Sequence, residues 1–511
     1  MEVEQDRSSF ISSRETLVPT GSFYDRQVKA TSRFRLADET DRMLEKATGL
    51  SYRWLDSISD VKSYAVVADD LLAAAPYRAV LQLLRKAGYV SSATLQDWRF
   101  NDLPHFFRFD ITPAYPSGST DRSLTSSFAH ASGKDPEETL SKAIGEFLER
   151  YFLTLYHKKD MMRASMKSLK QRGISHLDVR TLAGFSEEQK QAKLRFQWDE
   201  DSVFYWEKAF RVSTGESVYL PAQLIFWNYE VEPPEPILRE RNTNGAGGYF
   251  SKEGAILSGL YELIQRDAFL IHWLNSHAPP RVNPESVPNE TFQRILRESK
   301  RYGFETHCLN TTLDTGVPSF IVVAEDRASN GFGITMGGGC GPDPVSALLN
   351  AAQEVWSVYG WMRRQGQPFT LPEGFRPFAE PSIGQNERIL LWTNPAMAEH
   401  FRFFLNGKSG QFNEAAFPYP SRFPSESAEL QFLTNRVEAM GRGYEVYAYL
   451  PNDPVLKQLG YAAAKVIVPQ VVPLYLQEIY APLGAELLRS VPQKFGWDVS
   501  QAFNPWPHPF P

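Results

Sequence analysis

Apolar residues recur every three to four positions along Thr139–Phe152, TLSKAIGEFLERYF, and this spacing predicts a helix with one buried face. Glu146, Glu149 and Arg150 lie three and four residues apart, so their side chains occupy neighbouring faces of that helix. Carboxylates at this spacing can hold Mg²⁺, and an arginine can hold phosphate in a bidentate fork. A solvated charged face would show the same pattern.

A second segment repeats this arrangement. Tyr261–Ala268, YELIQRDA, carries Glu262, Gln265 and Arg266 in the same register inside another apolar helical pattern. Two buried helices that share E-x-x-[EQ]-R indicate two walls of one charged site, which makes the solvated-face interpretation less attractive.

Turn-forming stretches precede these helices and a third one. Arg241–Gly248, RNTNGAGG, opens the second helix, and its amides are expected to form an anion nest. Gly331–Asp343, GFGITMGGGCGPD, opens a helix predicted over Pro344–Tyr359, which contains Glu354. We therefore expect three loop-then-helix units, each of which contributes a glutamate.

The segment before the first helix contains Gly133 and Lys134, but it is not a Walker A loop. The G-x-x-x-x-G-K spacing requires glycine at position 128, where the sequence has Phe128. Any nucleotide bound here is therefore expected to be held outside the P-loop plan.

Composition narrows the class of protein. A net charge of −6 argues against a nucleic acid or an anionic membrane as the main partner. Two cysteines exclude a disulfide scaffold and fit a reducing cytoplasm, where we expect the protein to reside. Cys340 lies in a glycine-rich stretch without an evident base, so we interpret it as a structural thiol rather than a nucleophile. We see neither a signal peptide nor a membrane-spanning run.

The chain is expected to have a small α+β module over residues 1–100 and a main body over residues 104–511. Asp69–Leu84 followed by RKAGYV reads as helix, glycine turn and strand, which is typical of a winged-helix-like module or of an extension packed on the main body. Leu103–Ser119 reads as a linker or a strand that opens the body. Further elements are predicted as strands at 23–36, 444–450 and 465–468, as strand, turn and strand at 305–323, and as helices at 41–48, 430–441 and 473–488.

The chain ends in Asn504–Pro511, NPWPHPFP, with proline at every second position. Such a segment is extended and stiff and has few backbone donors. Because Trp506 and Phe510 alternate with the prolines as aromatic anchors, we expect the tail to dock on the body.

Several segments, in this order, resemble the YcaO family, and within it the azoline-forming cyclodehydratases of ribosomal peptide natural products. They are SGKDPEETLSKAIGEFLERYF, RNTNGAGGYFSKEGAILSGLYELIQRDAF, LNTTLDTGVPSFIVVAEDR with GGGCGPDPVSALLNAAQEVW, AAKVIVPQVVPLYLQEIYAPLG and the proline tail. The resemblance covers about residues 104–511. It implies a mixed α/β fold, a YcaO-like body of mixed sheets flanked by helices.

The resemblance also implies ATP and Mg²⁺ as cofactors and assigns roles to residues. The implied metal ligands are Glu146, Glu149 and Glu262; the implied nucleotide contacts are Arg150, Arg266, Glu354, Lys134 and Asn244; the implied catalytic tail residues are Pro511, Pro509 and Pro507. The carboxylate of Pro511 would act as a base or a positioning group.

The implied reaction is an ATP-dependent cyclodehydration that converts Cys, Ser or Thr of a precursor peptide to azolines. Thioamide or amidine formation and a non-catalytic scaffold that binds peptide for an active partner are the alternatives. The implied partners are the precursor peptide, a ThiF-like or leader-binding protein and further copies of the chain, with no nucleic acid and no membrane.

The sequence departs from the family pattern at several polar positions, which favours the scaffold alternative. The departures are Lys142, Phe250, Gly254, Ser258, Gln265, Ser357 and Tyr359. Gln265 in particular replaces a glutamate.

Overall fold

A computed structural model describes the chain over several ranges. They are residues 52–56, 62–67, 75–98, 106–113, 129–133, 136–328, 333–365, 368–379, 383–498, 500 and 502–510. The elements predicted at 23–36 and 41–48 lie outside these residues. The chain divides into two compact units, Met1–Ile144 and Gly145–Pro511, and the boundary falls inside one helix.

The first unit contains a five-stranded antiparallel sheet in which each strand pairs with the next along the chain. Its strands are β1 (Tyr52–Asp56), β2 (Lys62–Val67), β3 (Val90–Trp98), β4 (Phe106–Pro113) and β5 (Ala129–Gly133). Helix α4 (Ala75–Lys86) precedes β3, and Gly88 has a φ of 76° in the turn between them, which confirms the predicted helix, glycine turn and strand. Strand β4 lies within the segment expected to open the body. Strand β4 pairs with β3, which precedes residue 104, the predicted start of the main body. The domain boundary at that residue remains a prediction.

The second unit contains two sheets. The first runs in the order β6 (Met162–Ser165), β7 (Val203–Arg211), β15 (Tyr447–Tyr449), β16 (Ala462–Ile467) and β9 (Ala246–Tyr249), with β8 (Ser217–Pro221) paired to β7. The second runs in the order β13 (Ile334–Cys340), β12 (Ser319–Asp326), β11 (Phe304–Asn310), β10 (Arg281–Val282) and β14 (Ser409–Gly410). Together with the helices they form the mixed α/β fold predicted for the body.

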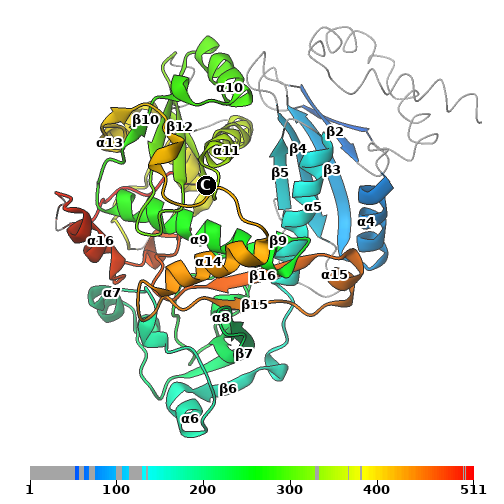
Figure 1. Ribbon diagram of the computed structural model, residues 1–511, viewed down its shortest axis with the longest axis vertical. Coiled ribbons are helices and arrows are strands. Elements are labelled where there is room, and N and C mark those ends of the chain that lie inside the picture. The colour runs from blue at the N-terminus through cyan, green and yellow to red at the C-terminus, as the bar shows by residue number, and fades with distance from the viewer. Residues whose placement is uncertain are drawn as a thin grey trace, which may run out of the picture. The chain divides into compact units, whose positions relative to one another are not determined.

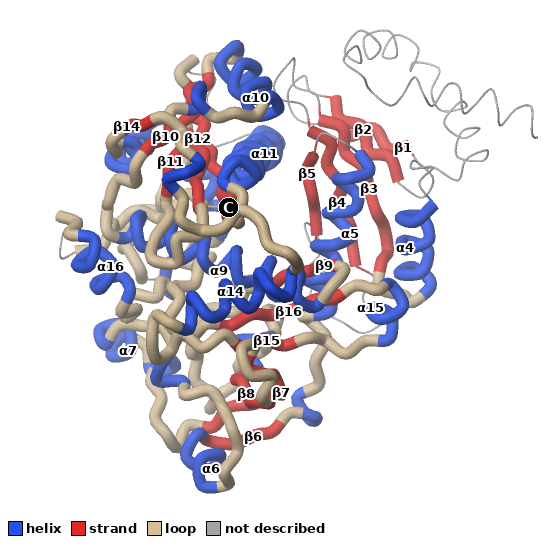
Figure 2. The backbone as a smooth tube through the Cα atoms, viewed as in Figure 1, coloured by secondary structure: helices blue, strands red, loops and turns tan. Residues whose placement is uncertain are grey.

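Helix α9 (Lys252–Leu274) lies between these two sheets and contacts strands of both (Figure 1). Its first half packs with β15 and β16, and its second half packs with β11 to β13. The other helices of the unit lie around the sheets, as the tube drawing shows (Figure 2). They are α6 (Met166–Gln171), α7 (Glu187–Ala192), α8 (Ala222–Ile225), α10 (Glu290–Arg301), α11 (Pro344–Gln365), α12 (Gln385–Leu391), α13 (Ala398–Phe401), α14 (Glu426–Glu438), α15 (Pro454–Leu459) and α16 (Leu487–Phe495).

The three predicted units are strand-then-helix units rather than loop-then-helix units. Helix α5 (Pro136–Phe152) follows β5, α9 follows β9, and α11 follows β13. The glycine-rich stretch 331–343 is largely strand β13, so its interpretation as a loop was wrong. Its glycines have a packing role, because a Cβ on Gly339 would lie 1.9 Å from the carbonyl oxygen of Ala347 on α11.

The same close approach joins the second pair of elements. A Cβ on Gly247 of β9 would lie 2.2 Å from the carbonyl oxygen of Ala255 on α9, a distance that real Cβ atoms do not occupy. Glycine therefore lets each strand approach its helix closely, and the glutamate farther along the helix reaches back to the strand.

The predicted helix at 473–488 is wrong in most of its length. Residues after Pro473 are irregular, a single 3-10 turn covers Glu478–Tyr480, and α16 begins only at Leu487. The apolar spacing there reflects burial of an irregular segment, because Leu474, Tyr475 and Ile479 are all buried.

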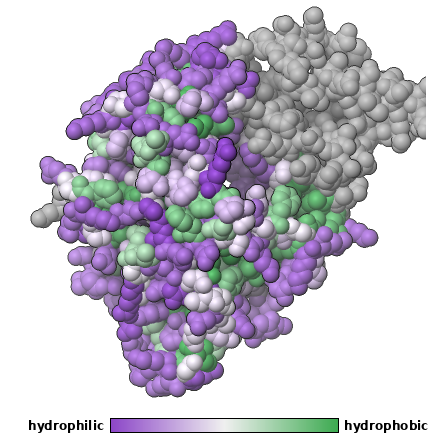
Figure 3. Space-filling view, in the orientation of Figure 1, coloured by the Kyte–Doolittle hydropathy of each residue, from purple (hydrophilic) through white to green (hydrophobic). Residues whose placement is uncertain are grey.

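Hydrophilic residues cover much of the described surface on the face drawn in Figure 3, with hydrophobic patches between them. Among the described residues, none of the helices combines the length and the apolar character needed to cross a membrane.

Candidate functional site

Helix α5 places Glu146, Glu149 and Arg150 in the second unit. The buried apolar residues Phe147 and Leu148 fix this turn of the helix, and Nη2 of Arg150 lies 2.6 Å from Oε1 of Glu146. The pKa of Glu149 is raised to about 8, first by burial and then by the negative charge of Glu262. Arg150 opposes this shift and Glu146 adds to it, so all these side chains lie within electrostatic reach of one another.

Helix α9 contributes the second wall. Nη2 of Arg266 lies 2.9 Å from Oε1 of Glu262, and the backbone amide of Gly245 donates a 2.7 Å hydrogen bond to Oε2 of the same carboxylate. Arg266 also donates to the side-chain oxygen of Asn244. The stretch 241–248 was predicted to bind an anion through its backbone amides. One of these amides, that of Gly245, binds the carboxylate of Glu262.

Asn244 lies just before β9 and is held in place by hydrogen bonds to Asn242 and to residue 474. Its amide nitrogen Nδ2 donates to the carbonyl of Leu474 at 2.6 Å, and Asn242 donates to the same carbonyl at 2.8 Å. Lys465 of β16 is 4% exposed and donates from Nζ to the carbonyl of Asn242 at 2.8 Å. The orientation of Arg266 thus depends on a network of buried polar side chains.

Burial lowers the pKa of Lys465 to about 7, although the charge of Glu262 acts in the opposite direction. Lys465 is not among the site residues predicted from the sequence. The signal was available, because Lys465 interrupts the apolar run AAAKVIV, and a cation inside a buried strand needs a polar partner.

Helix α11 contributes Glu354. Its Oε2 accepts a 2.6 Å hydrogen bond from the backbone amide of Gly338 on β13, as Glu262 accepts one from Gly245, the residue just before β9. The pKa of Glu354 is raised to about 7, first by burial and also by the charges of Glu262 and Glu146. The Gly338 amide and Arg266 act in the opposite direction.

The structure therefore brings together carboxylates from three helices, with two guanidinium groups among them. The carboxylates belong to Glu146, Glu149, Glu262 and Glu354, and we call these four residues the glutamate cluster. Raised pKa values at Glu149 and Glu354 mean that this arrangement disfavours the charged carboxylates. The four carboxylates are spread more widely than the ligands of a closed metal centre, because among the described residues only Glu305, His307 and Glu325 place three ligand atoms within 4.8 Å of one another. A divalent cation with oxygen ligands would remove the repulsion between the carboxylates of the glutamate cluster.

Two of the residues implied by the resemblance, Lys134 and Pro511, lie outside the described residues. Pro507 and Pro509 are described and buried, and they belong to the docked tail. Cys340 carries a thiol whose pKa is raised by burial, which agrees with its interpretation as a structural residue.

The tail docks on the body as predicted. Asn504 donates from its backbone amide to the carbonyl of Leu274 at the end of α9, and Trp392 donates to the carbonyl of Pro507 at 2.9 Å. The ring of Phe510 lies 5.0 Å from the ring of Phe269, centroid to centroid. A Cβ on Gly338 would lie 2.8 Å from the Phe510 ring, so the described end of the tail reaches the strand whose amide binds Glu354.

His508 of the tail does not titrate at the site. It is fully buried, and its Nε2 donates to the carbonyl of Tyr475 at 2.8 Å. Burial lowers its pKa well below the ordinary range, so the ring is neutral and serves to hold the tail.

A second group of ligand-type side chains, Glu305, His307 and Glu325, lies on strands β11 and β12 with ligand atoms within 4.8 Å of one another. Arg327 lies 2.9 Å from Glu305 and 3.1 Å from Glu325. Because an arginine already bridges both carboxylates, this group is an ion-pair network across two strands.

Comparison with known proteins identifies the family. A family model described as the YcaO cyclodehydratase, which binds ATP and Mg²⁺, matches residues 130–472. The chain therefore belongs to the YcaO family, as the resemblance predicted.

Solved structures share the fold. A heterocyclase in complex with substrate and cofactor has a TM-score of 0.66 and 21% identity, covering 85% of this chain and 57% of that one. YcaO from Methanopyrus kandleri bound with AMPPCP and Mg²⁺ has a TM-score of 0.53 and 18% identity, covering 78% and 91%. The E. coli microcin synthetase McbBCD complex with pro-MccB17 bound has a TM-score of 0.52 and 13% identity, covering 82% and 96%.

Two curated relatives also match. A protein of Methanothermobacter thermautotrophicus is 31% identical over 160 residues, which are 31% of this chain and 41% of that protein. A protein in the tfuA 3′ region of Rhizobium leguminosarum bv. trifolii is 25% identical over 242 residues, which are 46% of this chain and 55% of that protein. The chain thus spans about half the length of the curated relatives it matches.

Proposed function

We propose that this protein is an ATP- and Mg²⁺-dependent cyclodehydratase that converts Cys, Ser or Thr of a ribosomal precursor peptide to azolines. The observation that carries the proposal is the convergence of the glutamate cluster with Arg150 and Arg266, beside a tail docked against the strand that supports Glu354. Further support comes from the YcaO relative whose structure holds AMPPCP and Mg²⁺, and from the heterocyclase that holds substrate and cofactor.

The nucleotide is proposed to lie with its phosphates against α5 and α9. Glu146, Glu149 and Glu262 would hold Mg²⁺, which supplies positive charge between these carboxylates and the triphosphate. Arg150 and Arg266 each use part of the guanidinium on a glutamate of their own helix. A guanidinium has five N–H donors in a planar fork, a geometry that matches phosphate oxygens. Glu354, Asn244 and Lys134 complete the proposed set of nucleotide contacts.

The chemistry begins with attack of a substrate thiol or hydroxyl on the carbonyl carbon of the preceding residue. The oxygen of that carbonyl takes the terminal phosphoryl group of ATP and then leaves as part of phosphate, while the amide nitrogen loses its proton. An amide oxygen is a poor leaving group, and phosphorylation makes it a good one. The ring closes with a C=N bond, and the products are azoline, ADP and phosphate.

The tail is proposed to supply the proton acceptor. Pro507 and Pro509 make the segment stiff, so it loses little entropy on docking. A stiff tail that ends at Pro511 can present its carboxylate at a fixed point, where it would accept the proton from the attacking side chain.

Gln265 favours a second candidate function, that of a scaffold that binds substrate peptide for an active partner. Its amide replaces a carboxylate within the site, and a Cβ on Gly338 would lie 1.8 Å from its Nε2, so it fills the space beside Glu354. Thioamide or amidine formation would keep the nucleotide site and change only the nucleophile. The docked proline tail favours cyclodehydration over these two.

We also propose that the protein works with a ThiF-like or leader-binding partner and as a homo-oligomer. The E. coli microcin synthetase McbBCD is a complex, solved with pro-MccB17 bound. The peptide partner of the present chain would be a short sequence rich in Cys, Ser and Thr.

The test uses the full-length protein with candidate precursor peptides rich in Cys, Ser and Thr, together with Mg²⁺ and ATP. The expected product has lost one water per ring, as measured by mass spectrometry, and ADP forms in proportion. A gain in mass would identify thioamide formation and overturn the cyclodehydratase proposal. If calorimetry shows no binding of Mg²⁺ and AMPPCP, the scaffold proposal is correct instead.

A further inference from the structure

Arg388 of α12 is a fully buried arginine outside the glutamate cluster, and it joins three segments of the second unit. Its Nη1 donates to the carbonyls of Tyr475 and Leu476 at 2.9 and 2.8 Å. Its Nη2 lies 3.4 Å from the carbonyl oxygen of Phe510, to which it donates. The side chain is 0% exposed, so these carbonyls replace water around its charge.

Burial of a guanidinium needs compensation, and two acidic side chains supply it. Glu478 and Glu240 both have a pKa raised to about 7, chiefly by burial, and the positive charge of Arg388 acts against this shift in each case. Among the described residues, neither carboxylate oxygen of Glu478 has a hydrogen-bond partner. Glu478 thus interacts with Arg388 through charge, while the guanidinium keeps its donors for backbone carbonyls.

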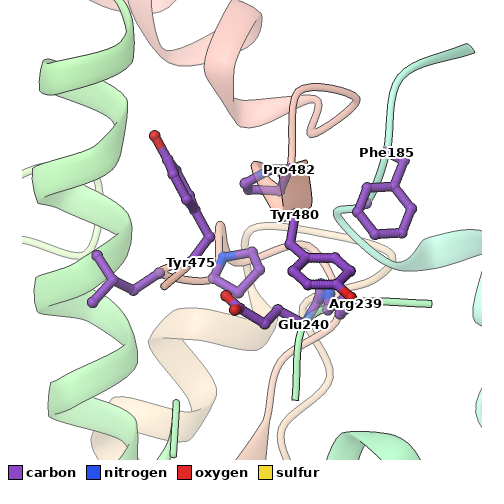
Figure 4. A pocket seen from close by; sticks show the side chains of 9 residues that line it. Phe185, Arg239, Glu240, Tyr475, Tyr480 and Pro482 are labelled. Carbon is purple, nitrogen blue, oxygen red and sulfur yellow. The ribbon is translucent and has the colours of Figure 1, made fainter. Parts of the chain in front are cut away.

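Glu240 holds the same irregular segment from its other side. It accepts a hydrogen bond from the backbone amide of Leu476, and it lines a small cavity of about 10 Å³, room for one water, together with Arg239 and Tyr475 (Figure 4). Arg388 and Glu240 therefore clamp residues 475 and 476 between them. Of these two side chains, Arg388 also reaches the tail, where His508 donates to the carbonyl of Tyr475 as well.

The opposite side of Phe510 faces the site. Its ring packs on Phe269 and lies against Gly338, whose amide binds Glu354. The last described residue of the tail is thus held at its carbonyl by Arg388 and at its ring by the strand beside the glutamate cluster.

We propose that Arg388 is the positioning residue that fixes the carbonyl of Phe510 and so holds the described end of the tail, beside the strand that supports Glu354, in the position that ring formation requires. The inference rests on the proposed function for its catalytic meaning. Arg388 touches no reacting atom in this proposal and acts through the tail. Its planar fork can donate to three carbonyls of two segments at once, which a lysine ammonium cannot do with the same geometry.

The test compares full-length Arg388→Met and Arg388→Lys with the parent protein, and Glu240→Gln serves as a control that alters the same clamp without touching the tail. Each protein is treated with a carboxypeptidase that removes proline, and release of the last two residues is followed by mass spectrometry. We expect the parent and Glu240→Gln to resist, Arg388→Met to lose them at least tenfold faster and Arg388→Lys to be intermediate. Cooperative thermal melting shows which variants are folded.

A kinetic measurement separates positioning from packing. Arg388→Met should lower kcat for ring formation at least tenfold and leave the KM for Mg²⁺ and ATP within twofold of the parent value. A folded variant with the parent rate of tail release, or with the parent kcat, would overturn the proposal. If Arg388→Met does not fold, Arg388→Lys decides by the same criteria. If the parent forms no ring, the proposed function fails, and the release assay alone decides whether Arg388 fixes the tail.

Discussion

The carboxylate of Glu354 accepts a 2.6 Å hydrogen bond from the backbone amide of Gly338. The same glycine has the side chains of Gln265 and Phe510 where a Cβ would otherwise project. One strand residue thus contacts helix α9, helix α11 and the C-terminal tail. These contacts require a residue without a side chain. Substitutions in the glycine-rich strand β13 should therefore disturb the site as well as the packing of the strand.

Gly339→Ala should destabilise the second unit. Its Cβ would lie 1.9 Å from the carbonyl oxygen of Ala347, and a backbone atom cannot move aside without shifting α11. We expect a loss of about 1–3 kcal/mol in the free energy of unfolding, measured by urea denaturation. Gly341→Ala is the matched control, because nothing lies within 4 Å of its Cβ position. Equal stability of the two variants would contradict the proposed close contact.

Gln265→Glu should tighten the binding of Mg²⁺ and ATP. It restores an anionic group beside Glu262 and Glu354, and a hydrogen bond to a charged group contributes about 1.5–3 kcal/mol. Isothermal titration calorimetry measures the change, with Gln265→Met as a control of similar size that adds no charge. Unchanged or weaker binding in Gln265→Glu would mean that the site is built around the amide.

Stability should fall as pH rises because of the buried carboxyl of Glu478. Its pKa is about 7 in the folded protein, against an ordinary value of 4.5, so the folded state binds the proton more tightly than the unfolded state does. Its contribution is fully present below pH 4.5 and is lost as pH rises to about 7, a change of about 1–3 kcal/mol.

Glu478→Gln removes this titration, so its unfolding free energy should vary less over that pH range. Urea denaturation at a series of pH values measures the slope. A slope as steep as that of the parent would assign the pH dependence to other groups, such as Glu240, whose pKa is also raised to about 7.

Removal of Phe510 and Pro511 should abolish ring formation and leave nucleotide binding nearly intact. The deletion takes away the proposed carboxylate and the ring that packs on Phe269, but none of the glutamate cluster. Product mass and calorimetry with AMPPCP measure the two effects. Pro505→Ala is a suitable control because Pro505 is exposed. If the truncated protein forms rings at the parent rate, the tail only stabilises the fold.

The sequence correctly predicted features that depend on local pattern. The three helices that carry Glu146, Glu262 and Glu354 followed from apolar spacing, and the docked tail followed from alternating prolines and aromatic anchors. Local pattern failed at two places. Most of the glycine-rich stretch forms strand β13 because glycine permits close packing on α11, and residues 473–486 are largely buried without forming an α-helix.

The sequence by itself determined which helix faces are apolar, which carboxylates share a register and how stiff the tail is, because each of these depends on neighbours within a few positions. Only the tertiary structure decided that Lys465 binds the carbonyl of Asn242, 223 residues away, and that Arg388 reaches Phe510 across 122 residues. Their partners are backbone carbonyls, which every residue possesses, so no residue type in the sequence marks them. The pairing of a buried charge with a distant carbonyl arises only when the sheets and α9 bring those segments together.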